Sequence, residues 1–210
     1  MADYRLFLIG DNAVAIEPAD REERHPLAAA LRKANRWIDV VPGKEVVAVQ
    51  FDPLDLLPSE AEAKVRAWLA DFHAEENPAG ETVDLHLDVS PDHAPDLERL
   101  ADSNGLSSQA FLERILASDL RVDMLGFTPG FAYVEGVDAG LKSERLSIPR
   151  QRVAAGAVGM VSGQLGFYGL AGPGGWPIIG KLSETLFDPA RQEPFLLREG
   201  QTIRLHLVGM

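Results

Sequence analysis

The chain has 210 residues, 46% of them hydrophobic and 25% charged, with a formal net charge of −12. This length suits one large domain or two small ones, and the acidic balance argues against nucleic acid as a partner, because its phosphates would be repelled. With no cysteine, disulfides, thiolate metal sites and cysteine nucleophiles are excluded. Since neither a signal-peptide pattern nor an apolar run of about 18 residues is present, we expect a cytoplasmic protein that does not enter a membrane.

Short strands and helices alternate in the first part of the chain. The expected elements are strands at 4–9 and 13–17, a helix over 25–37, strands at 38–41 and 46–51, a helix over 59–72 and a strand at 82–87. For the second helix, Ser59 and Glu62 fit a capping box, and the stop signals are Asn77, Pro78 and Gly80. This order resembles a ferredoxin-like α+β sandwich with an extra N-terminal strand.

The second part of the chain has a different pattern. Two short helices are expected at 96–103 and 107–116, and from Val122 onward short apolar runs are broken by glycine and proline as far as a strand at 202–208. Such a pattern is typical of a β-barrel or sandwich. The sequence therefore predicts an α+β domain over 1–88 and a β-barrel domain over 89–210.

A glycine-rich run from Leu125 to Lys181 holds thirteen of the nineteen glycines. Glycine permits turns and close backbone approach that a side chain would block. The run also has five Lys/Arg against three Asp/Glu, although the chain as a whole is acidic. This part of the chain is where the sequence favours a site for an anionic ligand.

Several familiar motifs are only partly matched. Gly175–Lys181 has the spacing of a phosphate-binding loop, but Leu182 stands where a magnesium-binding Ser or Thr is needed, so a turn entering a strand is favoured. The five histidines have no metal-ligand spacing and no metal is expected, although folding could bring some of them together. No nucleophile elbow is present.

Two stretches remain as candidates for the site. Gly126–Tyr133 places aromatic rings around Pro129-Gly130, which suits a type II turn, and Arg150 and Arg152 would lie on one face of an extended strand and could hold a carboxylate or phosphate. The aromatic residues could equally be barrel core, and the arginines could be solvated. No catalytic residue is assigned. The predicted substrate-binding residues are Phe127, Pro129, Phe131, Arg150, Arg152, Gln164, Tyr168, Gly174, Gly175 and Trp176.

These motifs resemble one known family, the B subunits of bacterial 5-oxoprolinases, also called allophanate hydrolase subunit 1, which includes an inhibitor of a sporulation histidine kinase. The matching segments, in order, are 126–133, 149–159, 163–164, 172–180 and 186–189, with weaker agreement at 10–17, 51–53 and 95–97. The chain departs from the family pattern at Asp88–Asp92, where a Cys-Tyr-Gly-Gly-Glu-like stretch is common, at Ile115, where histidine is common, and at Leu165, where threonine is common.

The resemblance implies a ferredoxin-like domain followed by a cyclophilin-like β-barrel. It also implies a partner homologous to the 5-oxoprolinase C subunit, in a heterodimer or heterotetramer, and an A subunit with which the complex uses ATP to convert 5-oxoproline to glutamate. ATP need not bind this chain. Related paired domains occur in urea carboxylase. The alternatives are a regulatory protein that inhibits a sensor histidine kinase and, by fold analogy alone, a prolyl isomerase.

Overall fold

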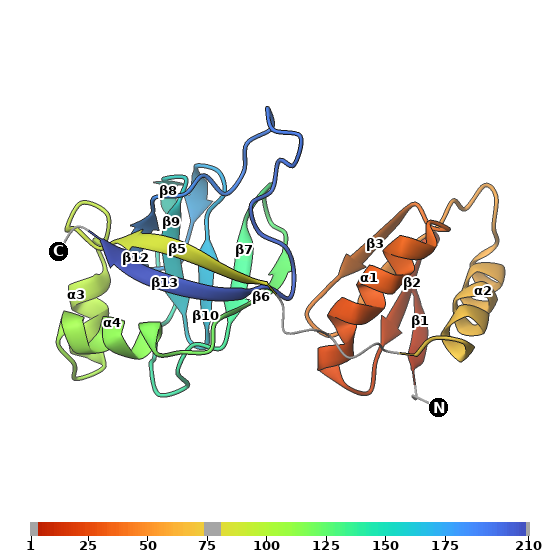
Figure 1. Ribbon diagram of the computed structural model, residues 1–210, viewed down its shortest axis with the longest axis horizontal. Coiled ribbons are helices and arrows are strands. Elements are labelled where there is room, and N and C mark those ends of the chain that lie inside the picture. The colour runs from red at the N-terminus through yellow and green to blue at the C-terminus, as the bar shows by residue number, and fades with distance from the viewer. Residues whose placement is uncertain (1–3, 74–80, 209–210) are drawn as a thin grey trace. The chain divides into compact units, whose positions relative to one another are not determined.

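The computed structural model describes residues 4–73 and 81–208. The chain divides into two compact units, Met1–Pro78 and Ala79–Met210 (Figure 1). Each unit has its own hydrophobic cluster, so each can be understood from its own side chains.

The first unit is a four-stranded antiparallel sheet with two helices packed on it. Its elements are β1 (Arg5–Ile9), β2 (Ala13–Glu17), a 3₁₀ turn (Arg21–Glu23), α1 (Arg24–Ala34), β3 (Asp39–Pro42), β4 (Val47–Gln50) and α2 (Pro58–Ala70). The sheet order is β1-β2-β4-β3. Val14 and Val49 of the sheet are fully buried in one cluster with Leu27 of α1 and Val65 of α2. One face of the sheet is thus covered by both helices.

The observed N-cap of the second helix, Leu57, lies two residues before the predicted cap at Ser59. The Glu60 carboxylate accepts the backbone N–H of Leu57 at 3.0 Å, and Pro58 takes the first helical position. The predicted capping box at Ser59 and Glu62 is therefore wrong, because the reciprocal carboxylate lies on Glu60. The predicted stop signals lie outside the described residues.

The second unit is a closed seven-stranded barrel with two helices and a two-stranded ribbon. Its elements are β5 (Thr82–Asp88), α3 (Leu97–Ser103), α4 (Ser108–Leu116), β6 (Arg121–Leu125), β7 (Ala132–Glu135), β8 (Arg150–Val153), β9 (Ala157–Val161), β10 (Gln164–Phe167), β11 (Gly172–Gly174), β12 (Ile178–Leu182) and β13 (Thr202–Val208). The barrel order is β10-β7-β6-β13-β5-β12-β9, and β11 pairs with β8 in the ribbon. Phe111 of α4 and Leu100 of α3 join the barrel core. The predicted α+β class with a barrel is confirmed.

Strand β5 belongs to the barrel and not to the first unit, which corrects the domain boundary predicted at residue 88. It pairs in parallel with β13 along its whole length, from Thr82 to Asp88. Leu85 and Leu87 are fully buried in the barrel core. The boundary therefore lies near residue 78, because a strand belongs to the sheet that satisfies its backbone hydrogen bonds.

The N-terminal strand takes the place that the sequence assigned to β5. The elements β2, α1, β3, β4 and α2 follow the order of a ferredoxin-like sandwich up to its last strand. Strand β1 fills the edge beside β2, antiparallel to it, where that last strand would lie. The first unit is thus a ferredoxin-like sandwich whose final strand is supplied from the start of the chain.

Candidate functional site on the outer face of the barrel

A small apolar cluster lies apart from the main core of the barrel. Along β7 and the residue directly before it, Ala132 and Val134 join the main core, whereas the alternate residues Phe131 and Tyr133 belong to or pack against the small cluster. Since successive side chains of a strand point to opposite faces, the small cluster covers the outer face of the barrel. Val153 of the β8–β11 ribbon packs into it, so the ribbon lies over this face.

The predicted aromatic residues meet in this outer cluster. The Phe131 ring centroid lies 4.8 Å from that of Tyr133, 5.0 Å from Tyr168 and 6.3 Å from Trp176, in edge-to-face arrangements. Phe131, Tyr168 and Trp176 are almost fully buried, and burial raises the pKa of the Tyr168 hydroxyl. The structure therefore places these three side chains in packing contacts, with little surface open to a ligand.

Several glycines of the glycine-rich run make room for these rings. A Cβ on Gly166 would lie 2.8 Å from Phe131 Cζ and 2.9 Å from Trp176 Cε3, and a Cβ on Gly159 would lie 2.8 Å from Trp176 Cβ. At Gly174 a Cβ would lie within 2.4 Å of the Tyr168 hydroxyl oxygen. Much of the glycine content thus serves ring packing against the backbone rather than anion binding.

The Pro129-Gly130 turn is confirmed. Gly130 has φ +72°, and the Phe131 N–H donates to the Thr128 carbonyl at 3.0 Å, as a type II turn requires. Phe127, directly before this turn, has φ 70° and is 63% exposed. A bulky residue with positive φ costs about 1 kcal/mol or more, and this exposed ring gains little burial in return.

A pocket of about 380 Å³ opens beside the turn. It is formed by Leu125–Gly130 and by Phe195, whose side chain is 44% exposed. Phe127 and Pro129 thus lie together at an apolar opening, and the Phe127 ring meets Phe131 edge-on at 5.4 Å. This is where the aromatic cluster reaches the surface.

Arg150 is held by an aspartate 54 residues away. Its Nη2 donates to Asp96 Oδ1 at 3.0 Å, and its Nη1 lies 2.8 Å from Asp96 Oδ2 in an ion pair with poor hydrogen-bond geometry. Asp96 also accepts the backbone N–H of Ile178 at 2.7 Å. Burial alone would raise the pKa of Asp96, but the bonds from Arg150 and Ile178 lower it. The charge of Arg150 is therefore largely committed to positioning the ribbon.

Two further arginines, Arg145 and Arg152, form no ion pair with residues in the part of the chain that the structure describes. Arg152 is exposed. The Arg145 guanidinium lies over the Trp176 ring at 5.7 Å, and the positive charges of Arg145 and Arg150 lower the pKa of the Tyr168 hydroxyl against the larger effect of burial. The sequence reasoning missed Arg145 and Asp96. The Pro95-Asp96-Leu97 segment, one of the weaker family matches, was the available signal for Asp96.

The remaining predicted site residues are spread along the same face. Gly174 pairs with Arg150 in the ribbon, and the Gly175 carbonyl accepts the N–H of Leu146 at 2.7 Å. Gln164 lies at the far end of β10, opposite Glu135, two residues before Gly166. The structure thus brings Gly174, Arg150, Tyr168 and Trp176 together, whereas Gln164 stands apart from them.

The three departures from the family pattern have different environments. Ile115 and Leu165 are fully buried in the main barrel core, away from the outer face. Asp88 accepts the Ser90 N–H at 2.8 Å and contacts His93 Nδ1 at 2.9 Å. These partners, the Ser90 N–H first, lower the pKa of Asp88 to about 2. Asp88 and His93 therefore form a polar group at the end of β5, where the family stretch is altered.

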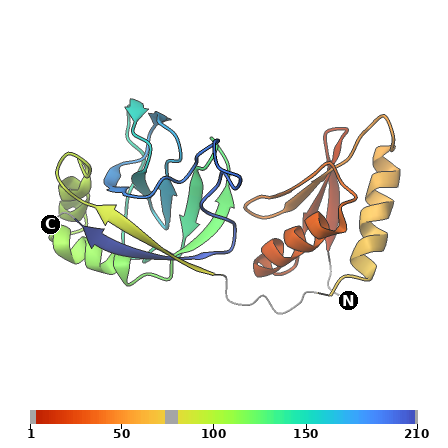
Figure 2. The same cartoon turned by 45° about the horizontal axis from the view of Figure 1, so that its top comes forward.

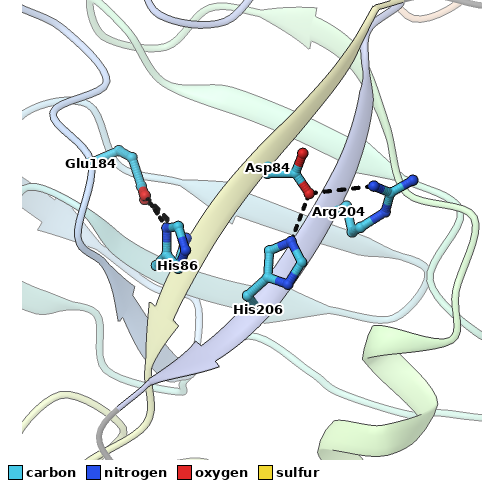
Figure 3. A network of polar contacts seen from close by, with 5 residues as sticks. All are labelled: Asp84, His86, Glu184, Arg204 and His206. Atoms are coloured by element: carbon cyan, nitrogen blue, oxygen red, sulfur yellow. Dashed lines mark hydrogen bonds and ion pairs between the residues drawn. The ribbon is translucent and has the colours of Figure 1, made fainter.

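The two histidines of β5 and β13 form carboxylate pairs on neighbouring strands (Figure 3). His86 Nδ1 contacts Glu184 Oε1 at 2.7 Å, and His206 Nε2 contacts Asp84 Oδ1 at 2.6 Å. His86 and His206 are in register, with ring centroids 5.6 Å apart. Within residues 4–73 and 81–208, no group of three or more His, Asp or Glu side chains is arranged to hold a metal ion.

We expect Glu184→Gln to lower stability in a pH-dependent way. Glu184 accepts the backbone N–H of His86 at 3.0 Å besides the imidazole contact. Burial opposes ionisation, but the His86 bonds lower the pKa of Glu184 below 4.5. A carboxylate with a lowered pKa stabilises the fold above its unfolded pKa and loses this contribution as the pH falls. The difference from the parent chain, about 1 kcal/mol at pH 6, should narrow below pH 4.

Urea unfolding of both chains at several pH values measures this difference. The matched variant is Glu62→Gln, whose carboxylate forms an exposed ion pair with Arg66 on α2. It should change stability by only about 0.5 kcal/mol. If the difference in unfolding free energy between Glu184→Gln and the parent chain stays constant from pH 6 to pH 3, the ionised Glu184 carboxylate is not the source of the stabilisation.

The near match to a phosphate-binding loop is a strand. Ile178–Leu182 forms β12, and Gly180 packs against Leu87 of β5, where an added Cβ would lie 2.5 Å from Leu87 Cδ1. A phosphate loop requires a helix after its last glycine, so the favoured interpretation as a turn into a barrel strand is confirmed. None of the helices in the described ranges is long and apolar enough to cross a membrane.

Comparisons with known proteins place this geometry in a family. Residues 4–197 match the family described as carboxyltransferase domain, subdomain C and D. The 5-oxoprolinase B subunit of Escherichia coli O157:H7 is 34% identical over an alignment 210 residues long, which covers 97% of this chain and 96% of that protein. The 5-oxoprolinase B subunit of Bacillus subtilis is 28% identical, with 96% and 91% covered.

Solved structures of known proteins have a similar fold. The crystal structure of TTHA0988 is 30% identical with a TM-score of 0.78 and covers all of this chain, which spans only 40% of that longer chain. The Kluyveromyces lactis urea carboxylase, at 14% identity, shares the fold with a TM-score of 0.76, over 99% of this chain and 22% of its own. The segments 126–133, 149–159 and 172–180, which contribute Phe131, Val153 and Ile178 to the outer cluster, all lie within the matched residues. This chain belongs to the carboxyltransferase subdomain C and D family and, within it, to the B subunits of 5-oxoprolinases.

Proposed function

We propose that this chain is the B subunit of an ATP-dependent 5-oxoprolinase, which opens the lactam of 5-oxoproline to give glutamate. The observation that carries the proposal is the 34% identity with a 5-oxoprolinase B subunit over nearly the full length of both chains. We further propose that a homologue of the C subunit completes the site at the outer face of the barrel and that the A subunit joins the complex.

Two features support a site shared with another chain. Phe127 stands exposed at positive φ beside an apolar pocket, at a cost in backbone energy that a contact with a partner or substrate would offset. In addition, TTHA0988 is a longer chain, of which the present fold is only 40%. The outer face of this barrel would then be half of the complete site.

The chemistry assigned to this chain is binding and charge stabilisation. In the complex, ATP would phosphorylate the lactam oxygen with release of ADP, and water would then open the ring and release phosphate. Arg152 and Arg145 would hold the substrate carboxylate or the phosphate, since Arg150 is paired with Asp96. Backbone N–H groups near Gly174 and Gly175 would face developing oxyanion charge, and Phe127 would help to exclude water.

The test is reconstitution. We expect the purified A and C subunits, combined with this chain, to release glutamate from 5-oxoproline only when ATP and this chain are both present. A complete complex of all three chains without turnover would overturn the proposal. Binding of a sensor histidine kinase, with no binding of the C subunit, would support the alternative of a kinase inhibitor.

Arg152→Gln tests the anion contact within this complex. Loss of one charge-assisted hydrogen bond to the substrate should raise KM about tenfold with a smaller change in kcat. Arg66→Gln, an exposed arginine of the first unit, is the matched control and should leave both values unchanged. An unchanged KM for Arg152→Gln would remove Arg152 from the site while leaving the activity itself established.

A further inference from the structure

The first unit contains a groove between its two helices. Its volume is about 1250 Å³, and Figure 2 shows α1 and α2 as two separate helices beside the sheet. The groove is lined by Pro26, Ala29, Ala30, Lys33, Arg36, Trp37, Leu56, Lys64, Ala67, Trp68, Asp71, Phe72 and His73. None of these residues belongs to the barrel, so the groove is independent of the face described above.

Each helix packs over a different half of the sheet, which leaves the groove open. Helix α1 lies against β3 and β4, and α2 lies against β1 and β2. The walls of the groove carry small side chains, Ala29 and Ala30 on α1 and Ala67 on α2. Small residues on facing walls let another backbone approach closely, as between packed helices about 8–10 Å apart.

Aromatic side chains supply apolar surface in the groove. The Trp68 and Phe72 rings stack at 5.2 Å with an interplanar angle of 20°. Trp37 lies in the same lining, and its indole Nε1 is buried without a hydrogen-bond partner among the described residues. The three rings thus give the groove an apolar lining.

The charge of the groove is opposite to that of the chain. Lys33, Arg36 and Lys64 line it and take part in no ion pair with described residues, and Asp71 is the single carboxylate of the lining. The chain as a whole carries −12. A cationic rim on an acidic protein selects an acidic partner, because the rest of the surface repels it.

We propose that this groove binds an acidic amphipathic helix of a partner protein. Its volume exceeds the roughly 300–1,000 Å³ of small-molecule sites, and two helical walls with an aromatic lining match recognition of a helix in a groove. The apolar face of the helix would meet Trp37, Trp68 and Phe72. Its Asp and Glu residues would meet Lys33, Arg36 and Lys64.

A designed peptide provides the probe. It is a fluorescein-labelled helix of about four turns, in which leucines are spaced alternately three and four residues apart and all other positions are glutamate. A second peptide has the same leucines and has lysine in place of every glutamate. By fluorescence anisotropy at 0.15 M salt, we expect the full chain to bind the glutamate peptide at least tenfold more tightly than the lysine peptide. Equal binding of the two peptides would overturn the proposal.

Two variants locate the binding. The double variant Lys33→Glu, Lys64→Glu should bind the glutamate peptide at least tenfold more weakly. The control double variant Lys44→Glu, Lys142→Glu makes the same change in net charge outside the groove and should have little effect on binding. Ala67→Trp places a large side chain in the groove from an exposed position and should abolish binding without loss of folding, checked by circular dichroism. An equal loss in the control pair, or full binding by Ala67→Trp, would place the interaction elsewhere.

Discussion

Replacing Asp96 with alanine is expected to destabilise the second unit by about 2–4 kcal/mol. The Asp96 side chain is 8% exposed, and its removal leaves the guanidinium of Arg150 and the N–H of Ile178 without their acceptor. Because Arg150 is 32% exposed and can partly rehydrate, the loss should fall below that of a fully buried pair. The ribbon strand β8 should also lose its anchor to the start of α3.

Hydrogen exchange of the β8 and β12 amides measures this effect. The matched variant is Asp188→Ala, which removes an exposed ion pair with Arg191 and an exposed hydrogen bond from the Ala190 N–H and should change the protection of the β8 and β12 amides by no more than about 0.5 kcal/mol. If Asp96→Ala lowers protection no more than Asp188→Ala, the Asp96–Arg150 link does not stabilise the ribbon.

Gly166→Ala is expected to destabilise the barrel by about 1–3 kcal/mol through steric overlap. The new methyl group would lie 2.8–2.9 Å from the rings of Phe131 and Trp176, both of which are packed. Gly172→Ala is the matched control in the same run, because a Cβ there has no neighbour within 4 Å. It should stay within about 0.5 kcal/mol of the parent chain.

A double variant tests the steric cause. Trp176→Phe removes part of the ring that the new methyl group would meet, so its cost should combine less than additively with that of Gly166→Ala, by about 0.5–1 kcal/mol. Hydrogen exchange of β9 and β10 gives the three free energies. If the free-energy costs of Gly166→Ala and Trp176→Phe add exactly, the methyl group at position 166 does not clash with the Trp176 ring.

How well the sequence predicted a feature depends on how far apart in the chain the interacting residues lie. The turn at Pro129-Gly130 depends on neighbouring residues and was predicted. The cap of α2 was misplaced because the residue at its N-cap, Leu57, has no capping side chain; the helix start is instead marked by Pro58 and by Glu60, which accepts the Leu57 N–H.

Some of the predicted site residues do lie close together in the structure. Motif order located the outer face of the barrel, since Phe131, Arg150, Tyr168 and Trp176 do meet there. Their burial and pairing could not be predicted, because a buried ring and a ligand-facing ring have the same letter in a sequence. The groove of the first unit was not foreseen, since its walls are ordinary helix faces until both are placed on the sheet.

By itself, the sequence determined the kinds of elements, the family motifs and the acidic character of the chain, because these depend on local periodicity, turn residues and composition. Tertiary structure decided which sheet each strand joins, so that β1 rather than β5 completes the first unit. It also decided that Arg150 is bound by Asp96 and that Gly166 accommodates two rings. These outcomes depend on contacts between residues far apart in the chain, and no local pattern specifies which distant partner a side chain meets.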